Sequence, residues 1–261
     1  MKKILLLGFI GIMCLMGNVA RAQFDDYGVK FGLGTATIAD DLGTKSPILG
    51  ANLGGYINFT FKHSQTALAE VFYLQTGLNM TRRGNLFEET RETGNTLSIR
   101  EGYHHIYYLQ LPVLAGVHME LPIREPGHVV GFFLGPAFNY GLFGRYADRM
   151  VTPGYTSRAA NYDVNFNGTD ADKALFNHIK RFDVSAILGV SYEHGNYTFS
   201  LFVDHGFVAV SEGIDVLSTI INNLNTTDPT TIDLNDLPKY PDGNNNAVIF
   251  SVSYKLGTLL K

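Results

Sequence analysis

The chain has 261 residues, with 20 Lys and Arg against 24 Asp and Glu and a formal net charge of −4. This acidic balance argues against nucleic acid as a partner, and a single cysteine excludes a disulfide framework. Glycine, tyrosine and phenylalanine are frequent (28, 14 and 18 residues), tryptophan is absent and only 17% of the residues are charged. Such a composition is typical of β-barrels whose strands alternate small and aromatic residues.

The N-terminus has the three parts of a secretory signal peptide. Lys2 and Lys3 precede an apolar run over residues 4–16, and a small-x-small cleavage site follows at residues 20–22. The run is too short for a membrane-spanning helix. We therefore expect residues 1–22 to be cleaved and residues 23–261 to form a single outer-membrane β-barrel domain, with a retained helical anchor as the alternative.

Eight segments in the rest of the chain alternate apolar residues with small or polar ones. This period of two is the pattern of β-strands with two different faces. The segments are residues 27–36, 49–61, 68–81, 103–120, 128–146, 180–194, 197–207 and 246–256.

The connections between these segments alternate in length. Three are short, namely residues 62–67, 121–127 and 195–196. Four are long and polar, namely residues 37–48, 82–102, 147–179 and 208–245. Antiparallel strands give this alternation when all short turns lie at one end, which is periplasmic in outer-membrane barrels. The sequence therefore predicts an all-β fold, an eight-stranded antiparallel transmembrane β-barrel with short periplasmic turns and long extracellular loops.

The two faces of the segments separate a membrane barrel from a soluble one. In the sixth segment, the even positions from Phe182 to Tyr192 are apolar, whereas the odd positions include Arg181, Asp183 and Ser185. Small or charged residues of this kind cannot form the core of the alternatives, a lipocalin-like barrel or a soluble sandwich. We therefore expect the bulky face to contact lipid and the polar face to fill a narrow lumen.

Four stretches carry a resemblance to a known family. They read IYYLQLPVLAGV (residues 106–117), GFFLGPAFNYGLFGR (131–145), FDVSAILGVSYEHGNYTFSLFVDHGF (182–207) and VIFSVSYKLG (248–257). The most specific pieces are YLQLP, which ends at Pro112, and the pair Gly135-Pro136. The chain resembles the PorT-like outer-membrane β-barrel family of Bacteroidetes-type bacteria. The resemblance implies an eight-stranded barrel, and one branch of that family is linked to protein secretion and gliding, whereas most members have no assigned activity.

Charged residues in the lumen-facing register should form ion pairs, because a buried charge needs a partner. The predicted network consists of Lys30, Glu120, Glu193 and Lys255 near the periplasmic end, and of Arg145, Arg181, Asp183 and Asp204 in the outer half. A barrel of eight strands has room for little besides its own side chains. We therefore expect a structural plug without an open pore, with a proton or ion path as the alternative.

Two prolines lie within predicted strands. Pro112 and Pro136 each remove a donor from the strand pairing. This predicts a kink or bulge that helps the barrel to close. The alternative is a weakened seam between the fourth and fifth strands that admits lipid or peptide sideways.

Three further features raise functional alternatives. His104 and His105, with Asp183 and nearby hydroxyl groups, would suit acyl transfer or deacylation, but no spacing indicates a catalytic triad. Residues 163–172 resemble the start of a calcium loop, although Ala174 stands where a bidentate acid is needed. Residues 215–224 place apolar side chains at helical spacing, which predicts a short helix over the barrel mouth or a partner-binding helix.

These observations predict a small non-enzymatic outer-membrane barrel that presents surface loops to a partner or assists protein secretion. A lipid-modifying outer-membrane enzyme is the alternative. We predict no catalytic residue, metal or cofactor. The expected partners are outer-membrane lipid, the barrel-assembly machinery during insertion, and an unknown protein or surface partner at the extracellular loops.

Overall fold

A computed structural model describes residues 23–39, 44–60, 72–93, 96–121, 127–152, 155–156, 160–166, 178–211 and 243–258 of the chain. The predicted signal segment, the predicted helix at residues 215–224 and most of the predicted cation loop lie outside these ranges. Within them, no helix is long and apolar enough to cross a membrane.

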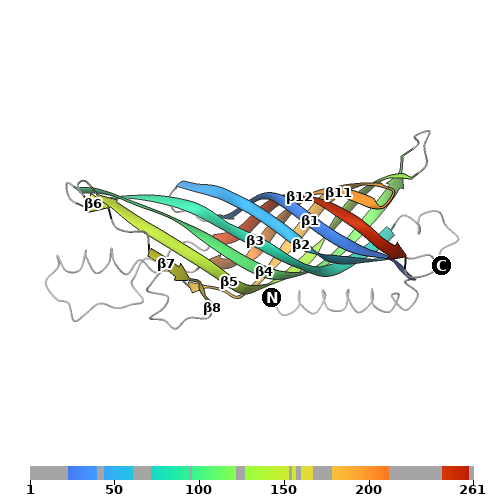
Figure 1. The fold of residues 1–261 in the computed structure, drawn as a ribbon, viewed down its shortest axis with the longest axis horizontal. Helices are drawn as coiled ribbons and strands as arrows, with labels where there is room; N and C mark the ends of the chain where they lie inside the picture. The colour runs from blue at the N-terminus through green and yellow to red at the C-terminus, as the bar shows by residue number, and fades with distance from the viewer. Residues whose placement is uncertain are drawn as a thin grey trace, which may run out of the picture.

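Eight long strands form one closed antiparallel sheet (Figure 1). They are β1 (Gln23–Ala39), β2 (Thr44–Thr60), β3 (Phe72–Thr93), β4 (Thr96–Glu120), β5 (His128–Thr152), β10 (Phe182–His194), β11 (Tyr197–Ser211) and β12 (Gly243–Thr258). Neighbouring strands pair in that order around the ring, and β12 pairs with β1 to close it. The short strands at one end are β6 (Tyr155–Thr156), β7 (Ala160–Asp163), β8 (Asn165–Phe166) and β9 (His178–Ile179). The predicted eight-stranded barrel is thereby confirmed.

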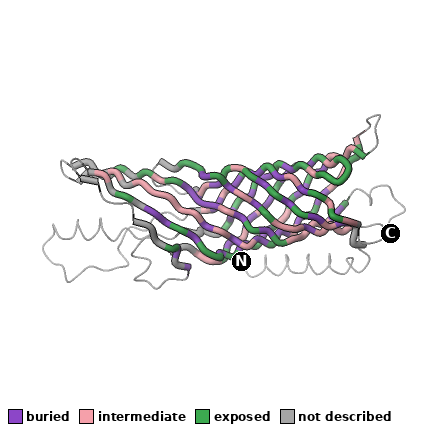
Figure 2. The backbone as a smooth tube through the Cα atoms, viewed as in Figure 1, coloured by how far each residue is buried: buried purple, intermediate pink, exposed green. Residues whose placement is uncertain are grey.

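Successive residues of each strand point alternately into the lumen and out of the barrel. Figure 2 shows the resulting alternation of buried and exposed positions along the strands. Large apolar side chains lie on the outside, among them Phe31, Leu53, Leu78, Leu134, Leu188, Leu201 and Phe250. Small or polar side chains are buried inside, among them Asn52, Gln110, Asn139, Ser185 and Ser251. Because a water-soluble protein would place these two sets the other way round, the exposed apolar band is the surface that faces lipid.

Of the three predicted short turns, the one between β10 and β11 is fully described. This hairpin turns through Gly195 and Asn196, and Gly195 has a φ of 61°, which glycine adopts without strain. β1 begins and β12 ends at the same end, where Asp26 pairs with Thr258. This end is periplasmic in outer-membrane barrels.

The opposite end differs from the predicted set of four long loops. β3 and β4 stay paired as far as Thr93 and Thr96, so residues 82–102 extend a hairpin where a loop was expected. β5 continues to Thr152 and pairs with β6 and β7 on its other side. We call this extension the projecting sheet, which consists of residues 86–93 of β3, 96–103 of β4 and 146–152 of β5, together with β6 and β7. Figure 1 shows it running past the ends of the other long strands.

The two prolines interrupt the hydrogen-bonded pairing of their strands without shifting the register. Next to Pro112 the β3–β4 pairing skips briefly, as does the β4–β5 pairing next to Pro136, and each resumes in the same register. Thr76 Oγ1 donates a hydrogen bond of 2.8 Å to the carbonyl oxygen of Pro112. The bulge expected at the prolines lies elsewhere, since the β4–β5 register shifts between Tyr107 and Tyr108.

Candidate functional site

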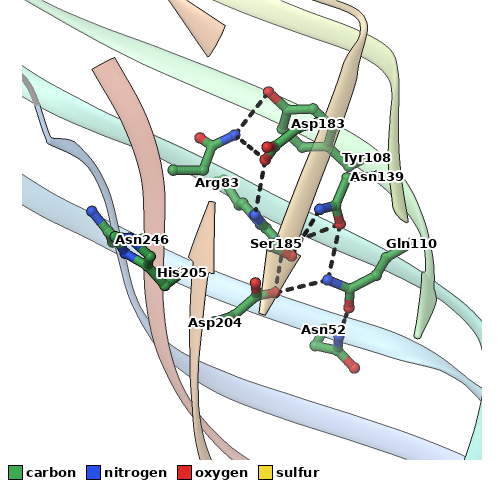
Figure 3. A network of polar contacts seen from close by, with 11 residues as sticks. Asn52, Arg83, Tyr108, Gln110, Asn139, Asp183, Ser185, Asp204, His205 and Asn246 are labelled. Carbon is green, nitrogen blue, oxygen red and sulfur yellow. Dashed lines mark hydrogen bonds and ion pairs between the residues drawn. The ribbon is translucent and has the colours of Figure 1, made fainter. Parts of the chain in front are cut away.

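Arg83 lies at the centre of a buried polar network in the outer half of the lumen (Figure 3). It comes from β3 and is 1% exposed. Its Nη2 donates to Asp204 Oδ2 on β11 at 2.5 Å, and its Nη1 lies 3.6 Å from Asp183 Oδ2 on β10. One guanidinium group therefore joins strands from distant parts of the ring. We call the connected set the Arg83 network, which comprises Asn52, Arg83, Tyr108, Gln110, Asn139, Asp183, Ser185, Asp204 and Asn245.

Amide side chains fill the space around the ions on the side of Asp204. Gln110 Nε2 donates to Asp204 Oδ2 at 2.7 Å and to Asn139 Oδ1 at 2.9 Å. Asn139 Oδ1 also accepts from Arg83 Nη2 at 3.2 Å, and its Nδ2 donates to Ser185 Oγ at 3.0 Å. The ions and amides are therefore held by one continuous set of hydrogen bonds.

A second branch of the network surrounds Asp183. Asn245 Nδ2 donates to Asp183 Oδ2 at 3.1 Å and lies 3.2 Å from the Tyr108 hydroxyl. The Arg83 guanidinium stands 5.7 Å from the centre of the Tyr108 ring, within the range of a cation–π contact. Because a buried charge is costly unless it is paired and hydrogen-bonded, these contacts explain how the lumen tolerates two carboxylates.

Apolar layers lie on both sides of the Arg83 network. On the outer side, a buried cluster includes Ile38, Ile106, Tyr108, Tyr146, Val164 and Phe166. On the periplasmic side, the buried layer includes Leu114, Phe133, Ile187, Phe202 and Ile249. Phe166 lies in β8 and Val164 directly precedes that strand. This short strand therefore contributes to closing the outer mouth.

A chain of polar side chains fills the periplasmic third of the lumen. Lys255 Nζ lies 2.9 Å from Asp26 Oδ2 and 3.3 Å from Glu193 Oε1. Asp26 Oδ1 accepts from Asn58 Nδ2 at 2.8 Å, and Asn58 Oδ1 accepts from Gln75 Nε2 at 2.9 Å. The chain ends at Lys30, which is buried and donates to Gln75 Oε1 at 3.2 Å.

Two small cavities adjoin Lys30. One, of about 20 Å³, is lined by residues of the periplasmic chain, and the other, of about 10 Å³, is lined by residues that include Asn52 and Gln110. A cavity of about 10–15 Å³ is needed to hold one water molecule. The larger cavity can therefore hold a water molecule beside Lys30, and neither has the size of a substrate pocket.

The structure brings together some of the predicted lumen charges and separates others. Asp183 and Asp204 meet at Arg83, and Glu193 meets Lys255, while Lys30 joins the latter pair through amides. Glu120 stands exposed at the end of β4, outside the filled part of the lumen. The prediction missed Arg83, Asp26 and the linking amides.

Arg145 was expected in the lumen and lies on the outside of the barrel. Tyr107 pairs with Phe143 and Tyr108 pairs with Gly141, so β5 has one extra residue at the bulge. A single inserted residue reverses the alternation of side chains beyond it. Asn139 therefore points inward on an odd position, whereas Arg145 points outward.

Arg181 also departs from the expected lumen position. It precedes the first residue of β10, so the alternation of inward and outward side chains along that strand does not determine where it points. Its Nη1 lies 3.1 Å from the hydroxyl of Tyr140, which is exposed on the outside of the barrel. Its guanidinium also stacks over Tyr140 and Phe166 at the rim.

The two neighbouring histidines lie on opposite faces of β4. His104 points inward, where its Nδ1 lies 3.2 Å from Asn85 Oδ1 and its ring contacts Tyr146. His105 points outward, where its ring stacks on Tyr103 and its Nε2 lies 3.1 Å from Arg82 Nη2. The described residues contain no group of three or more His, Asp or Glu side chains placed to hold a metal ion.

The chain is similar to known outer-membrane proteins. Residues 22–209 match the family described as outer membrane protein beta-barrel domain. No curated protein matches the chain. Among solved structures, the crystal structure of Ail, the attachment invasion locus protein of Yersinia pestis, in complex with the heparin analogue sucrose octasulfate, is similar over 90% of this chain and 100% of that chain, at 11% identity and a TM-score of 0.37.

Proposed function

The chain belongs to the outer membrane protein beta-barrel domain family and is a barrel of the outer membrane, and on this premise we propose that it is a non-enzymatic protein whose projecting sheet binds a partner at the cell surface. The observation that carries the proposal is the length of three neighbouring strands. β4 and β5 have 25 residues each and β3 has 22, whereas β10 has 13. A tilted strand needs only about 9–11 residues to cross a bilayer.

The filled lumen supports the same proposal. The Arg83 network and the apolar layer below it occupy the interior, so the working surfaces are the lipid face and the outer end. The periplasmic β10–β11 turn is short, whereas the projecting sheet offers paired strands on a rigid base. Elements of this kind on a rigid scaffold commonly carry binding functions.

The enzymatic alternative has less support. His104 and His105 lie on opposite faces of β4, so a single catalytic centre cannot use both. Asp183 is held by Arg83 and Asn245 inside the lumen. His104 and Asp183 contact other residues inside the lumen, and His105 contacts residues on the outer surface.

A role in protein secretion is the second form of the proposal. It rests on the resemblance to the PorT-like family of Bacteroidetes-type bacteria, one branch of which is linked to protein secretion. This resemblance stays a prediction. In that form, the partner would be a component or a cargo of a secretion system. A strain that lacks the gene should then lose specific proteins from its culture medium.

The experiment shortens the projecting sheet and leaves the barrel intact. Glu88 and Glu101 pair across β3 and β4, so residues 89–100 can be replaced by a two-residue Asn-Gly turn. The shortened barrel should fold, shown by heat-modifiable migration, and should fail to complement the deletion strain. An insertion between Gly195 and Asn196 at the periplasmic turn serves as the control and should complement. Full complementation by the folded, shortened barrel would contradict the proposal.

A further inference from the structure

Basic side chains form a half-belt around the outer edge of the apolar band. Above Met80 the next outward side chain of β3 is Arg82, and above Tyr107 the next outward side chain of β4 is His105. On β5, Arg145 follows the outward Phe143, and Arg181 directly precedes the outward Phe182 of β10. β3, β4, β5 and β10 are consecutive in the ring. We call Arg82, His105, Arg145 and Arg181 the basic half-belt.

In the other half of the barrel, the first outward residues above the apolar band are Thr35 on β1, Pro47 on β2, His205 on β11 and Asn246 on β12, and none of these four is a lysine or an arginine. His205 Nδ1 lies 2.5 Å from Asn246 Oδ1, so these two residues contact each other. Among the described side chains at this edge of the apolar band, the arginines therefore lie on one side of the ring.

Local contacts hold the basic half-belt at the surface. Arg82 Nη2 donates to the imidazole of His105, whose ring stacks on Tyr103 with a centroid distance of 4.5 Å. His105 and Arg145 face each other directly across β4 and β5. Arg181 donates to the hydroxyl of Tyr140. Arg82 and His105 are therefore in contact, Arg145 is in register with His105, and Arg181 is held separately by Tyr140.

The basic half-belt has a net positive charge. Asp163 on β7 pairs with Arg145 in the register. Glu101 belongs to a different pair further out, with Arg149. Three guanidinium groups against one carboxylate leave an excess of positive charge at the level where the headgroups of the outer leaflet lie.

We propose that the basic half-belt binds the phosphate groups of a phosphorylated glycolipid in the outer leaflet of the membrane. Guanidinium groups bind phosphate through two parallel hydrogen bonds. Directly below them, Met80, Tyr107, Phe143 and Phe182 offer an apolar surface for acyl chains. A ligand with phosphates above and acyl chains below fits both parts of this surface, and a soluble anion fits only one. The site is separate from the projecting sheet and does not depend on the function proposed for it.

The experiment measures retention of defined lipids by the full-length barrel, refolded in detergent and followed by native mass spectrometry. The probes are bis-phosphorylated lipid A, the same lipid without phosphates, and inorganic phosphate as a competitor. We expect preferential retention of the bis-phosphorylated lipid. Each change among Arg82→Gln, Arg145→Gln and Arg181→Gln should weaken retention about fivefold, which corresponds to the usual contribution of one basic residue near an anionic membrane surface.

The matched control is Arg149→Gln, which removes an exposed arginine from the same strand as Arg145 but further from the membrane. It should leave retention unchanged, and all variants should show the heat-modifiable migration of a folded barrel. Equal retention of both lipids, or an equal loss for Arg149→Gln, would overturn the proposal. Displacement of the lipid by inorganic phosphate at a similar concentration would also overturn it, because the site would then be one for free anions.

Discussion

Arg83 and Asp204 are 121 positions apart in the sequence and meet inside the barrel, with Arg83 Nη2 at 2.5 Å from Asp204 Oδ2. The contact connects β3 with β11, two strands that do not pair with each other. Asp183 on β10 approaches the same guanidinium. A single side chain thus neutralises charge from two further strands, and the barrel interior depends on it.

Replacement of Arg83 should be among the most damaging single changes in the lumen. Arg83→Met leaves Asp183 and Asp204 buried without their cation, and removal of one partner from a buried ion pair costs about 3–5 kcal/mol. Urea unfolding in detergent micelles measures this loss. Adding Asp183→Asn and Asp204→Asn to Arg83→Met should restore most of the stability, because the carboxylates are then neutral amides. Arg149→Gln, at an exposed ion pair, should cost about 0–1 kcal/mol, and an equal loss there would contradict the argument.

Leu188 tests which side of the barrel faces lipid. It is 64% exposed on the outside of β10, beside its partner Leu134 of β5. Leu188→Arg should destabilise the barrel by about 2–4 kcal/mol in a bilayer, since an arginine near the midplane is costly. Asn196→Arg in the exposed periplasmic turn should stay within about 0.5 kcal/mol. Equal tolerance at both positions, measured by unfolding in lipid vesicles, would be incompatible with a lipid-facing surface.

Gly84 marks a place where β3 has no room for a side chain. Its φ is 147°, and a Cβ atom would lie 1.9 Å from the backbone oxygen of His104. Gly84→Ala should therefore force the β3–β4 hairpin apart next to Arg83. Gly127→Ala is the matched control, because Gly127 also has a positive φ of 96° but has no atom within 4 Å of an added Cβ.

The control separates backbone strain from steric conflict. Gly127→Ala should cost about 1–2 kcal/mol, the usual penalty for a left-handed residue, and Gly84→Ala should cost more. Thermal unfolding monitored by gel migration measures both. If the two variants lose the same stability, the close approach of the His104 backbone oxygen to Gly84 does not add to the cost of the substitution.

Periodicity alone predicted the ring of strands, and the reason is physical. The apolar face of a membrane barrel must alternate with its lumen face over the whole width of the bilayer, so every segment carries the signal. Beyond the membrane this requirement ends. Residues 86–93 and 96–103 pair as strands, but the polar stretch at residues 88–93 and the glycines at 94 and 102 made the segment resemble a loop.

The lumen site was harder to predict, because it depends on register. Arg83 continues the inward series of Gln75, Asn79 and Thr81 on β3, and extending the period by one step would have found it. Arg145 was misplaced because the extra residue at the Tyr107 bulge leaves no clear mark in the sequence. The partners Asp26 and Asn58 lie on strand ends, where alternation alone does not distinguish lumen from solvent.

The filled lumen should not conduct ions. Three closures lie in series along the lumen: the outer apolar cluster that includes Ile106 and Phe166, the Arg83 network, and the apolar layer that includes Phe133 and Phe202, whose ring centres are 6.4 Å apart. An ion would have to pass all three, so the native barrel should show no stable conductance in planar bilayers.

The series arrangement also predicts how the barrel can be opened. Phe133→Ala with Phe202→Ala removes only one closure and should leave the barrel closed. Adding Arg83→Ala and Gln110→Ala to that pair weakens two of the three closures. Adding Ile106→Ala and Phe166→Ala as well weakens the outer cluster, and this barrel should show measurable channel openings. Leu188→Ala, on the lipid face, is the control and should change nothing. Stable, large conductance through the native protein would show that the lumen is open and that the Arg83 network does not seal it.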